Sequence, residues 1–312
     1  MPPSKRLDCS IVIPAFNASR TIEELILRIH QVLSSLSVSF EIIVIDDASQ
    51  DNTWGILIGL TELQSFNLRA FRLMRNSGQH SASIYGIRRS VGKVVITMDD
   101  DLEHQPEEIP KLFLAADGID TLVIAANASA TNPKTSFGSR LVNAVLRTTF
   151  RLPPSFQLST FRAFSREIGI AATSRVKPHP YLTAMLLSVA SQRVNVQVSR
   201  GSERESRYSL RSRIGLAIDL LFSHSKFLSV GNIALLGLSA LFSLGVSGVL
   251  VERWATGREA LPGWTSTLLT VILVGAITQA IVVFQTVLLL RVYRALLADE
   301  SVIVAQSSEP DE

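Results

Sequence analysis

The sequence predicts an α/β domain built on a mostly parallel sheet, followed by an amphipathic helix and two transmembrane helices. Between residues 10 and 126, short β-branched runs alternate with segments whose apolar residues recur at helical spacing. This alternation is typical of parallel strands joined by right-handed helical crossovers. Two long uncharged stretches lie near the C-terminus, and they account for a mean hydropathy of +0.29, which is high for a purely soluble enzyme.

Four short runs, three of them rich in β-branched residues, are expected to form strands, and they occupy residues 10–14, 40–45, 70–74 and 93–98. The segment 19–36 between the first two is predicted to be a helix, because its apolar residues are three or four positions apart. Ligands of such sheets bind beyond the carboxyl ends of the strands. Polar residues follow all four runs at this end, which indicates a single active site there.

The second strand leads into the segment 46–53, which begins with Asp46 and Asp47. Carboxylates at this place could accept hydrogen bonds from a nucleobase or from a ribose hydroxyl. The same segment could also start a helix, with Ser49 or Asp51 as its N-cap. The two interpretations are compatible with each other.

The third strand leads into the sequence RNSGQH at residues 75–80. Gly78 permits a ligand to approach the backbone closely, and the side-chain amides of Asn76 and Gln79 offer hydrogen-bond donors. Taken alone, this sequence is also compatible with an ordinary loop.

The fourth strand leads into the acidic sequence DDDLE at residues 99–103, which is the strongest motif. If the segment stays extended, Asp99, Asp101 and Glu103 share one face and Asp100 points away from them. Carboxylate oxygens at this spacing suit Mg²⁺ or Mn²⁺, with substrate phosphates and water completing the coordination. A solvated acidic turn is the structural alternative.

Two other metals fit the sequence less well than Mg²⁺ or Mn²⁺. A calcium loop would require glycine at the position of His104. A zinc site built on His80 and His104 would require further cysteines or a close histidine pair, and the chain has a single cysteine, Cys9. The single cysteine also excludes an intrachain disulfide, and a net charge of +3 is too small to indicate a nucleic-acid partner.

The C-terminal third is expected to bind the membrane. Residues 227–251 and 264–290 contain no charged side chain, and both exceed the roughly 20 residues that a helix needs to cross a bilayer. Before them, residues 210–222 place Leu210, Ile214 and Ile218 on one helical face, which predicts an amphipathic helix on the membrane surface, with an ordinary surface helix as the alternative. Small residues every four positions at Ser239, Ser243 and Ser247 favour a homo-oligomer.

Basic residues predict the orientation of the two spans. They gather before the first span and after the second, whereas the connecting loop carries a balanced pair of arginines and glutamates. The N-terminus has no signal-peptide pattern. We therefore expect a multi-pass protein of the inner (cytoplasmic) membrane with both termini in the cytoplasm. Its expected parts are a catalytic domain (1–209), a juxtamembrane helix (210–226), a transmembrane hairpin (227–291) and a cytoplasmic tail (292–312).

The order of these motifs resembles the family 2 glycosyltransferases of GT-A fold. Within them, the chain is similar to the polyprenyl-phosphate branch, which comprises dolichyl-phosphate mannose synthases, bactoprenol glucosyltransferases and undecaprenyl-phosphate aminoarabinose transferases. The matching sequences are SIVIPAFN at 10–17, IDDASQDNT at 45–53, RNSGQHSA at 75–82, MDDDLEHQPEEIPKL at 98–112, FRAF at 161–164 and SRYSL at 206–210. The tandem C-terminal spans match the bactoprenol subgroup.

The resemblance implies roles for individual residues. The nucleotide-sugar would be bound by Pro14, Ala15, Asn17, Asp46, Asp47, Asn76, Gln79, Asp99 and Asp100. Asp101 and Glu103 would bind the metal, and Asp99, Asp101 and Arg162 would be catalytic. The acceptor phosphate would lie near Arg162, Arg200, Arg204 and Tyr208. Two departures stand out: Ala18 follows Asn17 where the family usually has an acid, and the segment 152–159 lacks the aspartate that often precedes the FR arginine.

The implied reaction transfers a sugar, with inversion, from a nucleotide-sugar to polyprenyl phosphate. UDP is favoured over GDP by family analogy alone. One alternative is a processive polysaccharide synthase of the same fold, but Leu250 stands where the QxxRW motif of those enzymes has glutamine, and two spans are too few for a polymer channel. The other alternative is an inactive transferase that serves as a binding or scaffold subunit.

Overall fold

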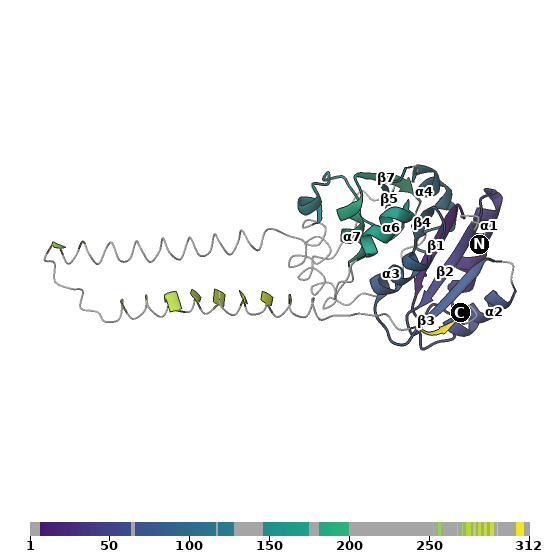
Figure 1. Ribbon diagram of the computed structural model, residues 1–312, viewed down its shortest axis with the longest axis horizontal. Helices are drawn as coiled ribbons and strands as arrows, with labels where there is room; N and C mark the ends of the chain where they lie inside the picture. The colour runs from purple at the N-terminus through teal and green to yellow at the C-terminus, as the bar shows by residue number, and fades with distance from the viewer. Residues whose placement is uncertain are drawn as a thin grey trace. The chain divides into compact units, whose positions relative to one another are not determined.

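The computed structural model describes residues 7–63, 66–116, 118–127, 146–174, 181–199 and 304–308, together with scattered positions between 252 and 292. The chain divides into two compact units. One contains residues 1–217 and 299–312, and the other contains residues 218–298. The described part of the first unit is an α/β domain whose helices cover both faces of a central sheet (Figure 1).

Eight strands of the described residues form one sheet in the order β7-β5-β6-β4-β1-β2-β3-β8. Their bounds are β1 Cys9–Ala15, β2 Phe40–Asp46, β3 Leu68–Leu73, β4 Val94–Thr97, β5 Thr121–Asn127, β6 Arg162–Ser165, β7 Gln192–Val198 and β8 Val304–Ser307. The parallel pairing expected for the first four strands is confirmed. The sheet as a whole is mixed, because β6 runs antiparallel to β4 and β5, and β8 runs antiparallel to β3.

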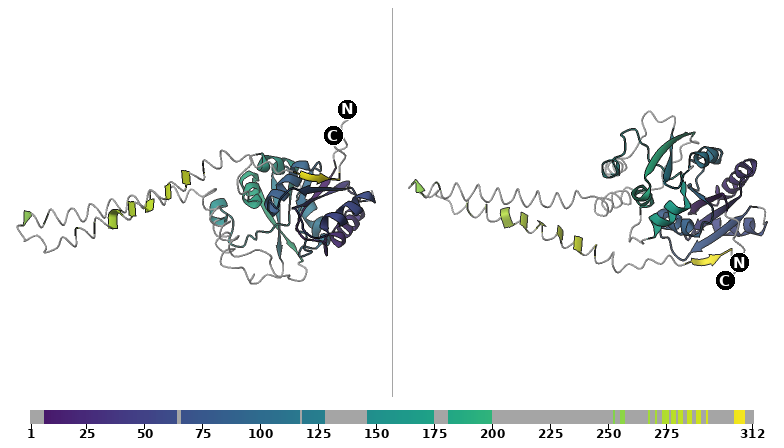
Figure 2. Two further views of the ribbon diagram at one scale, coloured as in Figure 1. Left: turned by 90° about the horizontal axis from the view of Figure 1, so that it is seen from below. Right: turned by 45° about the horizontal axis from the view of Figure 1, so that its top comes forward.

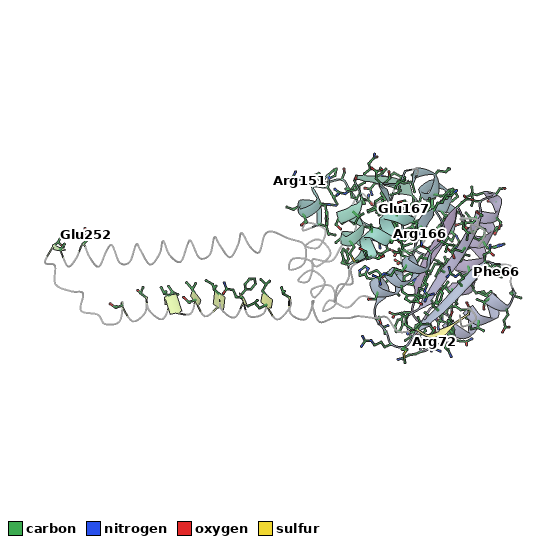
Figure 3. The ribbon with its side chains drawn as sticks, in the orientation of Figure 1. Phe66, Arg72, Arg151, Arg166, Glu167 and Glu252 are labelled. Carbon is green, nitrogen blue, oxygen red and sulfur yellow. The ribbon has the colours of Figure 1, made fainter. Side chains whose placement is uncertain are left out.

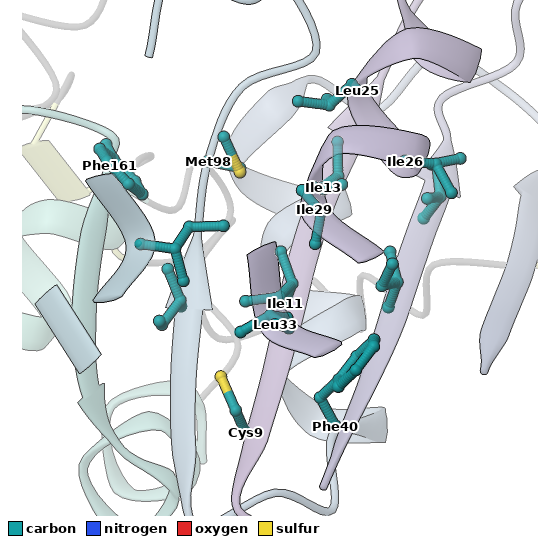
Figure 4. Close-up of a cluster of buried hydrophobic side chains, with 14 of the residues drawn as sticks. Cys9, Ile11, Ile13, Leu25, Ile26, Ile29, Leu33, Phe40, Met98 and Phe161 are labelled. Atoms are coloured by element: carbon teal, nitrogen blue, oxygen red, sulfur yellow. The ribbon is translucent and has the colours of Figure 1, made fainter. Parts of the chain in front are cut away.

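Strand residues alternate between two hydrophobic clusters, one on each face of the sheet. Ile11 and Ile13 of β1 join the cluster under α1 (Ile22–Ser35), α2 (Thr53–Glu62) and α4 (Ile109–Ala115), which Figure 4 shows. Val12 joins the opposite cluster under α3 (Gln79–Arg89), α6 (Arg166–Thr173) and α7 (Leu182–Val189). Both faces of the strands are thus buried, which explains why these strands are continuous apolar runs in the sequence.

The acidic segment does not continue the strand before it. β4 ends at Thr97, a short 3-10 helix η1 follows at Pro106–Glu108, and Leu102 has a positive φ of 61°. Residues 99–103 therefore bend, and the extended alternation expected for them is wrong. The carboxylates are oriented instead by the contacts that each one makes.

The predicted membrane segments fall mostly outside the described residues. Nothing is described between 200 and 251, and the second predicted span is described only at scattered positions. Within the described residues, no helix combines the length and the apolar character that crossing a bilayer requires.

Candidate active site

The loops that follow β1 and β2 are held together by hydrogen bonds. The backbone amide of Asn17 donates to the Ser49 hydroxyl at 2.9 Å, and the Asn17 side-chain oxygen accepts from the backbone amide of Gln50 at 2.9 Å. Asn17 has a positive φ of 53°, a conformation that asparagine tolerates better than most residues. Pro14 and Ala15 are buried at the end of β1, and Asn17 itself is exposed. The two loops thus form one rigid edge of the site.

Asp46 and Asp47 bind the backbone of neighbouring loops. Asp46 is fully buried and accepts a hydrogen bond from the backbone amide of Ser49 at 3.0 Å. Asp47 accepts from the backbone amides of Ser77 and Gly78 at 2.7 and 2.8 Å, which ties the loop after β2 to the loop after β3. Burial raises the pKa of Asp47, and the two amide donors oppose that shift. Both aspartates therefore shape the loops for which the family resemblance predicts nucleotide binding.

Asp99 connects the third loop to the segment before β6. Its carboxylate accepts hydrogen bonds from the side-chain amide of Gln79 and, at 2.6 Å, from the Thr160 hydroxyl. Burial raises the pKa of Asp99 to about 7, and the charges of Asp101 and Asp100 add to the shift while the Thr160 hydroxyl opposes it. Without a bound cation, the Asp99 carboxyl group is therefore partly protonated near neutral pH.

Asp100 and Asp101 make separate local contacts. The Asp100 carboxylate accepts a hydrogen bond from the backbone amide of Phe16 at 2.9 Å. Asp101 accepts from the backbone amide of Glu103 at 3.0 Å. No group of three or more acidic, histidine or cysteine side chains in the described part of the chain could hold a metal by itself. The donor set still fits Mg²⁺ or Mn²⁺, because such ions are commonly held by one or two carboxylates plus substrate phosphates.

Arg162 is a buried cation on β6. It is 2% exposed, and its guanidinium donates to the hydroxyls of Thr97 at 3.1 Å and Thr183 at 2.7 Å. Burial lowers its pKa to about 10, and the nearby Tyr181 and Asp99 oppose the shift. The group therefore remains charged at neutral pH, and the contacts that hold it are hydroxyls, which orient the cation without neutralising it.

Two histidines lie close to these acidic and basic groups. The ring of His80 packs edge-on against Tyr181, with 4.8 Å between ring centroids, and burial, with the Arg162 charge, lowers its pKa to about 3. The Nε2 atom of His104 lies 3.1 Å from the Ser159 hydroxyl, and burial lowers its pKa to about 4 against the opposing effect of Asp101. Both rings are therefore neutral at physiological pH.

The residues expected at the site fall into three groups: those at the ends of β1 to β4 or in the loops that follow them, Arg162 on β6, and those outside the described residues. Those after β1 to β4 lie at one end of the sheet, and Gln79 and Asp99 are in direct contact. Asn76 is exposed in the loop after β3. Arg200, Arg204 and Tyr208 lie outside the described residues. Sequence reasoning missed the hydroxyl partners Thr97, Thr160 and Thr183, because single threonines carry no recognisable signal.

Comparison with known proteins decides the family. The model of the family described as glycosyl transferase family 2 matches residues 10–174. The chain belongs to this family. It is 32% identical over 243 residues to an undecaprenyl-phosphate 4-deoxy-4-formamido-L-arabinose transferase of Pseudomonas fluorescens, covering 75% of this chain and 71% of that protein. A transferase of the same name from Sodalis glossinidius is 30% identical over 264 residues, with 81% of each chain covered.

Among solved structures, the glycosyltransferase resembles glucosyl-3-phosphoglycerate synthase from Mycobacterium tuberculosis, crystallised with Mn²⁺, UDP and phosphoglyceric acid. The TM-score is 0.51 at 22% sequence identity, and the match covers 70% of this chain and 78% of that one. This likeness establishes the fold and nothing finer, and it confirms the GT-A fold that the motifs imply. The family membership confirms that the chain is of the glycosyltransferase class.

Proposed function

We propose that this glycosyltransferase moves a sugar from a nucleotide-sugar to polyprenyl phosphate at the cytoplasmic face of a membrane, with inversion at the anomeric carbon. The observation that carries the proposal is the convergence of the loops after β1 to β4 on the acidic segment 99–103, next to the buried cation Arg162. A site that pairs carboxylates with a fixed guanidinium suits a reaction between two phosphorylated substrates. The names of the relatives, which are undecaprenyl-phosphate sugar transferases, support this acceptor.

The donor binds along the edge formed by the loops after β1, β2 and β3. Asn17, Ser49 and Gln50 hold the first two loops together, and Asp47 holds the third. This bonding fixes the backbone before a nucleotide arrives, so less conformational entropy is lost on binding. Pro14, Ala15, Asp46 and Asn76 line or support the same edge, and a uridine nucleotide is the donor we expect.

Asp101 and Glu103 are the residues that would hold a divalent cation, either Mg²⁺ or Mn²⁺. When bound, the cation would supply Lewis-acid stabilisation of the charge on the departing diphosphate. Asp99 lies beside this pair and is fixed by Gln79 and Thr160. The Asp100 side chain holds the loop after β1 through Phe16, so its contribution to donor binding is indirect.

The segment 152–159 lacks the aspartate that often precedes the FR arginine in this family. None of the side chains in the segment 152–159 is basic enough to act as a general base, because it contains no aspartate, glutamate or histidine, and its glutamine, Gln157, carries a carboxamide that accepts from the backbone amide of Asn127. A hydroxyl acceptor would need such a base. A phosphate monoester has a second pKa near 6 and is already largely anionic at pH 7. It needs a cation to position it, and Arg162 is the described residue that meets this need, with Arg200, Arg204 and Tyr208 as further candidates from the sequence.

Membrane anchoring is part of the proposal. The uncharged stretches 227–251 and 264–290 support two spans, with 210–226 as an interfacial helix and 292–312 returning to the cytoplasm. The pairing of β8 with β3 supports an even number of crossings, because residues before and after the hydrophobic stretches belong to one sheet. A cysteine substituted at Gly257 is expected to react with an impermeant thiol reagent in intact cells, and labelling only after lysis would reverse this topology.

The experiment that tests the function incubates membranes containing the protein with labelled nucleotide-sugars, undecaprenyl phosphate and Mg²⁺ or Mn²⁺. We expect the label to enter an organic-extractable lipid, and transfer to stop in excess EDTA. Label in an insoluble polymer would indicate a processive synthase. Absence of transfer with every donor, while the nucleotide still binds, would indicate an inactive scaffold subunit. An Asp101→Ala variant provides the matched inactive control.

A further inference from the structure

The C-terminal strand β8 is an edge strand of the catalytic sheet, which the sequence motifs did not indicate. It pairs antiparallel with β3, and Figure 2 shows it in yellow along the edge of the sheet. Beyond it, the backbone amide of Ser308 donates to the carbonyl of Ala70 at 2.9 Å, and the Ser308 hydroxyl accepts from the amide of Ala70 at 2.8 Å. The chain thus leaves for the second unit after residue 217 and returns to the sheet that carries the site.

The pairing of β8 with β3 is irregular at one position, where β8 carries an extra residue, Ala305, opposite the step from Arg72 to Leu73. Arg72 lies opposite Gln306, and the register shifts between Arg72 and Leu73. An irregularity of this kind bends a strand and re-aims a side chain, and such features are frequent next to active sites. Arg72, which Figure 3 labels, lies between its register partners on the two neighbouring strands, Asp46 of β2 and Gln306 of β8.

Arg72 points at the loop after β2. One guanidinium nitrogen donates to the carbonyl of Ser49 at 2.9 Å, and its Nε atom lies 3.3 Å from the Oδ2 atom of Asp46. Asp46 is fully buried, and no hydrogen bond within the described residues reaches this oxygen. The Arg72 charge is therefore what compensates it, and a buried carboxylate that loses its counter-charge is strongly destabilised.

The loop after β2 also forms part of the edge along which we propose that the donor binds. The Ser49 hydroxyl accepts the hydrogen bond of Asn17, and the next residue, Gln50, binds the Asn17 side chain. A connected series of contacts therefore runs from β8 through Arg72 to Ser49 and then to Asn17. Each link is a hydrogen bond, an ion pair or a strand pairing between described residues.

We propose that β8 is a positioning element for the donor: by pairing with β3 it holds in place the strand that carries Arg72 and the contacts of Arg72 with Asp46 and Ser49, and so keeps the loops after β1 and β2 in their binding conformation. The inference rests on the proposed function, because it assumes that these loops bind the nucleotide-sugar. It assigns the end of the polypeptide a role in donor affinity and leaves the acceptor side untouched.

The test compares the wild type, a variant that ends after Ile303, and full-length Ala305→Ser, a control that changes one exposed side chain and keeps the strand backbone. Direct binding of UDP and steady-state kinetics with both substrates are measured. We expect truncation to weaken UDP binding and raise KM for the nucleotide-sugar about tenfold, the effect of losing one charge-assisted hydrogen bond, with KM for lipid phosphate within about twofold. The control should match the wild type.

Two further measurements separate positioning from general loss of stability. Arg72→Met should reproduce the effect of truncation, and the two changes combined should be no worse than either alone, because they break one series of contacts. A synthetic peptide of residues 301–312 added to the truncated protein should restore donor affinity. Unchanged donor KM after truncation, or additive effects with Arg72→Met, would overturn the inference. If wild-type protein binds no nucleotide at all, the proposed function itself fails.

Discussion

The backbone amide of Phe16 donates a 2.9 Å hydrogen bond to the Asp100 carboxylate, and this contact joins the loop after β1 to the acidic segment after β4. The Asp100 carboxylate therefore binds the protein's own backbone. Asp101, one residue further, accepts only the local hydrogen bond of Glu103 among the contacts described, and it is the better candidate for a cation ligand. Neighbouring aspartates in one motif thus have different tasks.

This difference predicts that substitutions of Asp100 and Asp101 reduce sugar transfer to different extents. Asp101→Ala should abolish sugar transfer, because a carboxylate that helps to hold the cation cannot be replaced by a methyl group. Asp100→Ala should retain measurable kcat with a higher KM for the donor, because one loop contact is lost. Steady-state kinetics at several Mg²⁺ or Mn²⁺ concentrations provide the measurement. Equal loss of kcat in the two variants would contradict the assignment.

A second prediction concerns Arg162 and the acceptor. Arg162→Ala should lose far more activity than Arg207→Ala, since Arg162 is a buried cation held by Thr97 and Thr183, whereas Arg207 is expected to flank the membrane. The measurement is kcat/KM for lipid phosphate in each variant. Because Arg162 is buried, thermal unfolding of both variants must be recorded as the control. A folded Arg162→Ala protein with normal kcat/KM would contradict its role.

A third prediction follows from the neutral ring of His80. Its pKa in the folded protein is about 3, below the ordinary value of 6.5, so between these pH values the unfolded chain binds a proton that the native state does not. Stability should therefore fall as the pH falls from about 6.5 toward 3. His80→Phe keeps a ring against Tyr181 and removes this proton. The variant's unfolding midpoint should fall less steeply with acid than that of the wild type, whereas parallel curves would contradict the assignment.

Two glycines provide a matched test of packing. A Cβ atom on Gly86 of α3 would lie 2.5 Å from a Val12 methyl group, whereas one on Gly59 of α2 would meet nothing within 4 Å. Gly86→Ala should destabilise the domain by about 1–3 kcal/mol through overpacking. Gly59→Ala should stabilise it by about 0.5–1 kcal/mol through helix propensity. The measurement is the unfolding midpoint of each variant at one pH. A change in stability of the same sign for both substitutions would contradict the packing described around Gly86 and Gly59.

The parts of the fold that the sequence predicts well are those with a strong local signal. β1 to β4 contribute to the clusters on both faces of the sheet and read as short apolar runs, which are rich in β-branched residues in β1, β2 and β4. Each lies within two residues of its expected bounds. Strands β5, β6, β7 and β8 were not predicted. β6 coincides with the FRAF motif, and β8 has an unremarkable VAQS sequence in a segment expected to be a tail. Their positions depend on pairing with strands distant in the sequence.

The candidate site likewise has features that the local sequence predicts and features that it does not. The loops and their acidic residues are evident from where the strands end, but the partner of each side chain is not. Asp51 illustrates this: helix α2 does begin in its segment, but the N-cap is Asn52 and not Ser49 or Asp51, and the Asp51 carboxylate instead accepts from the backbone amides of Thr53 and Ser19. Thr160 gives no signal at all, since its contact with Asp99 depends on a segment without regular structure.

The central claim is that the acceptor is a phosphate that already carries its charge. The most direct test compares transfer of labelled sugar to undecaprenyl phosphate and to undecaprenol by the same purified protein, at pH 7 with a divalent cation. The account predicts efficient transfer to the phosphate and none detectable to the alcohol, since the described site offers no base in the segment 152–159. Transfer to undecaprenol at a similar kcat/KM would contradict it.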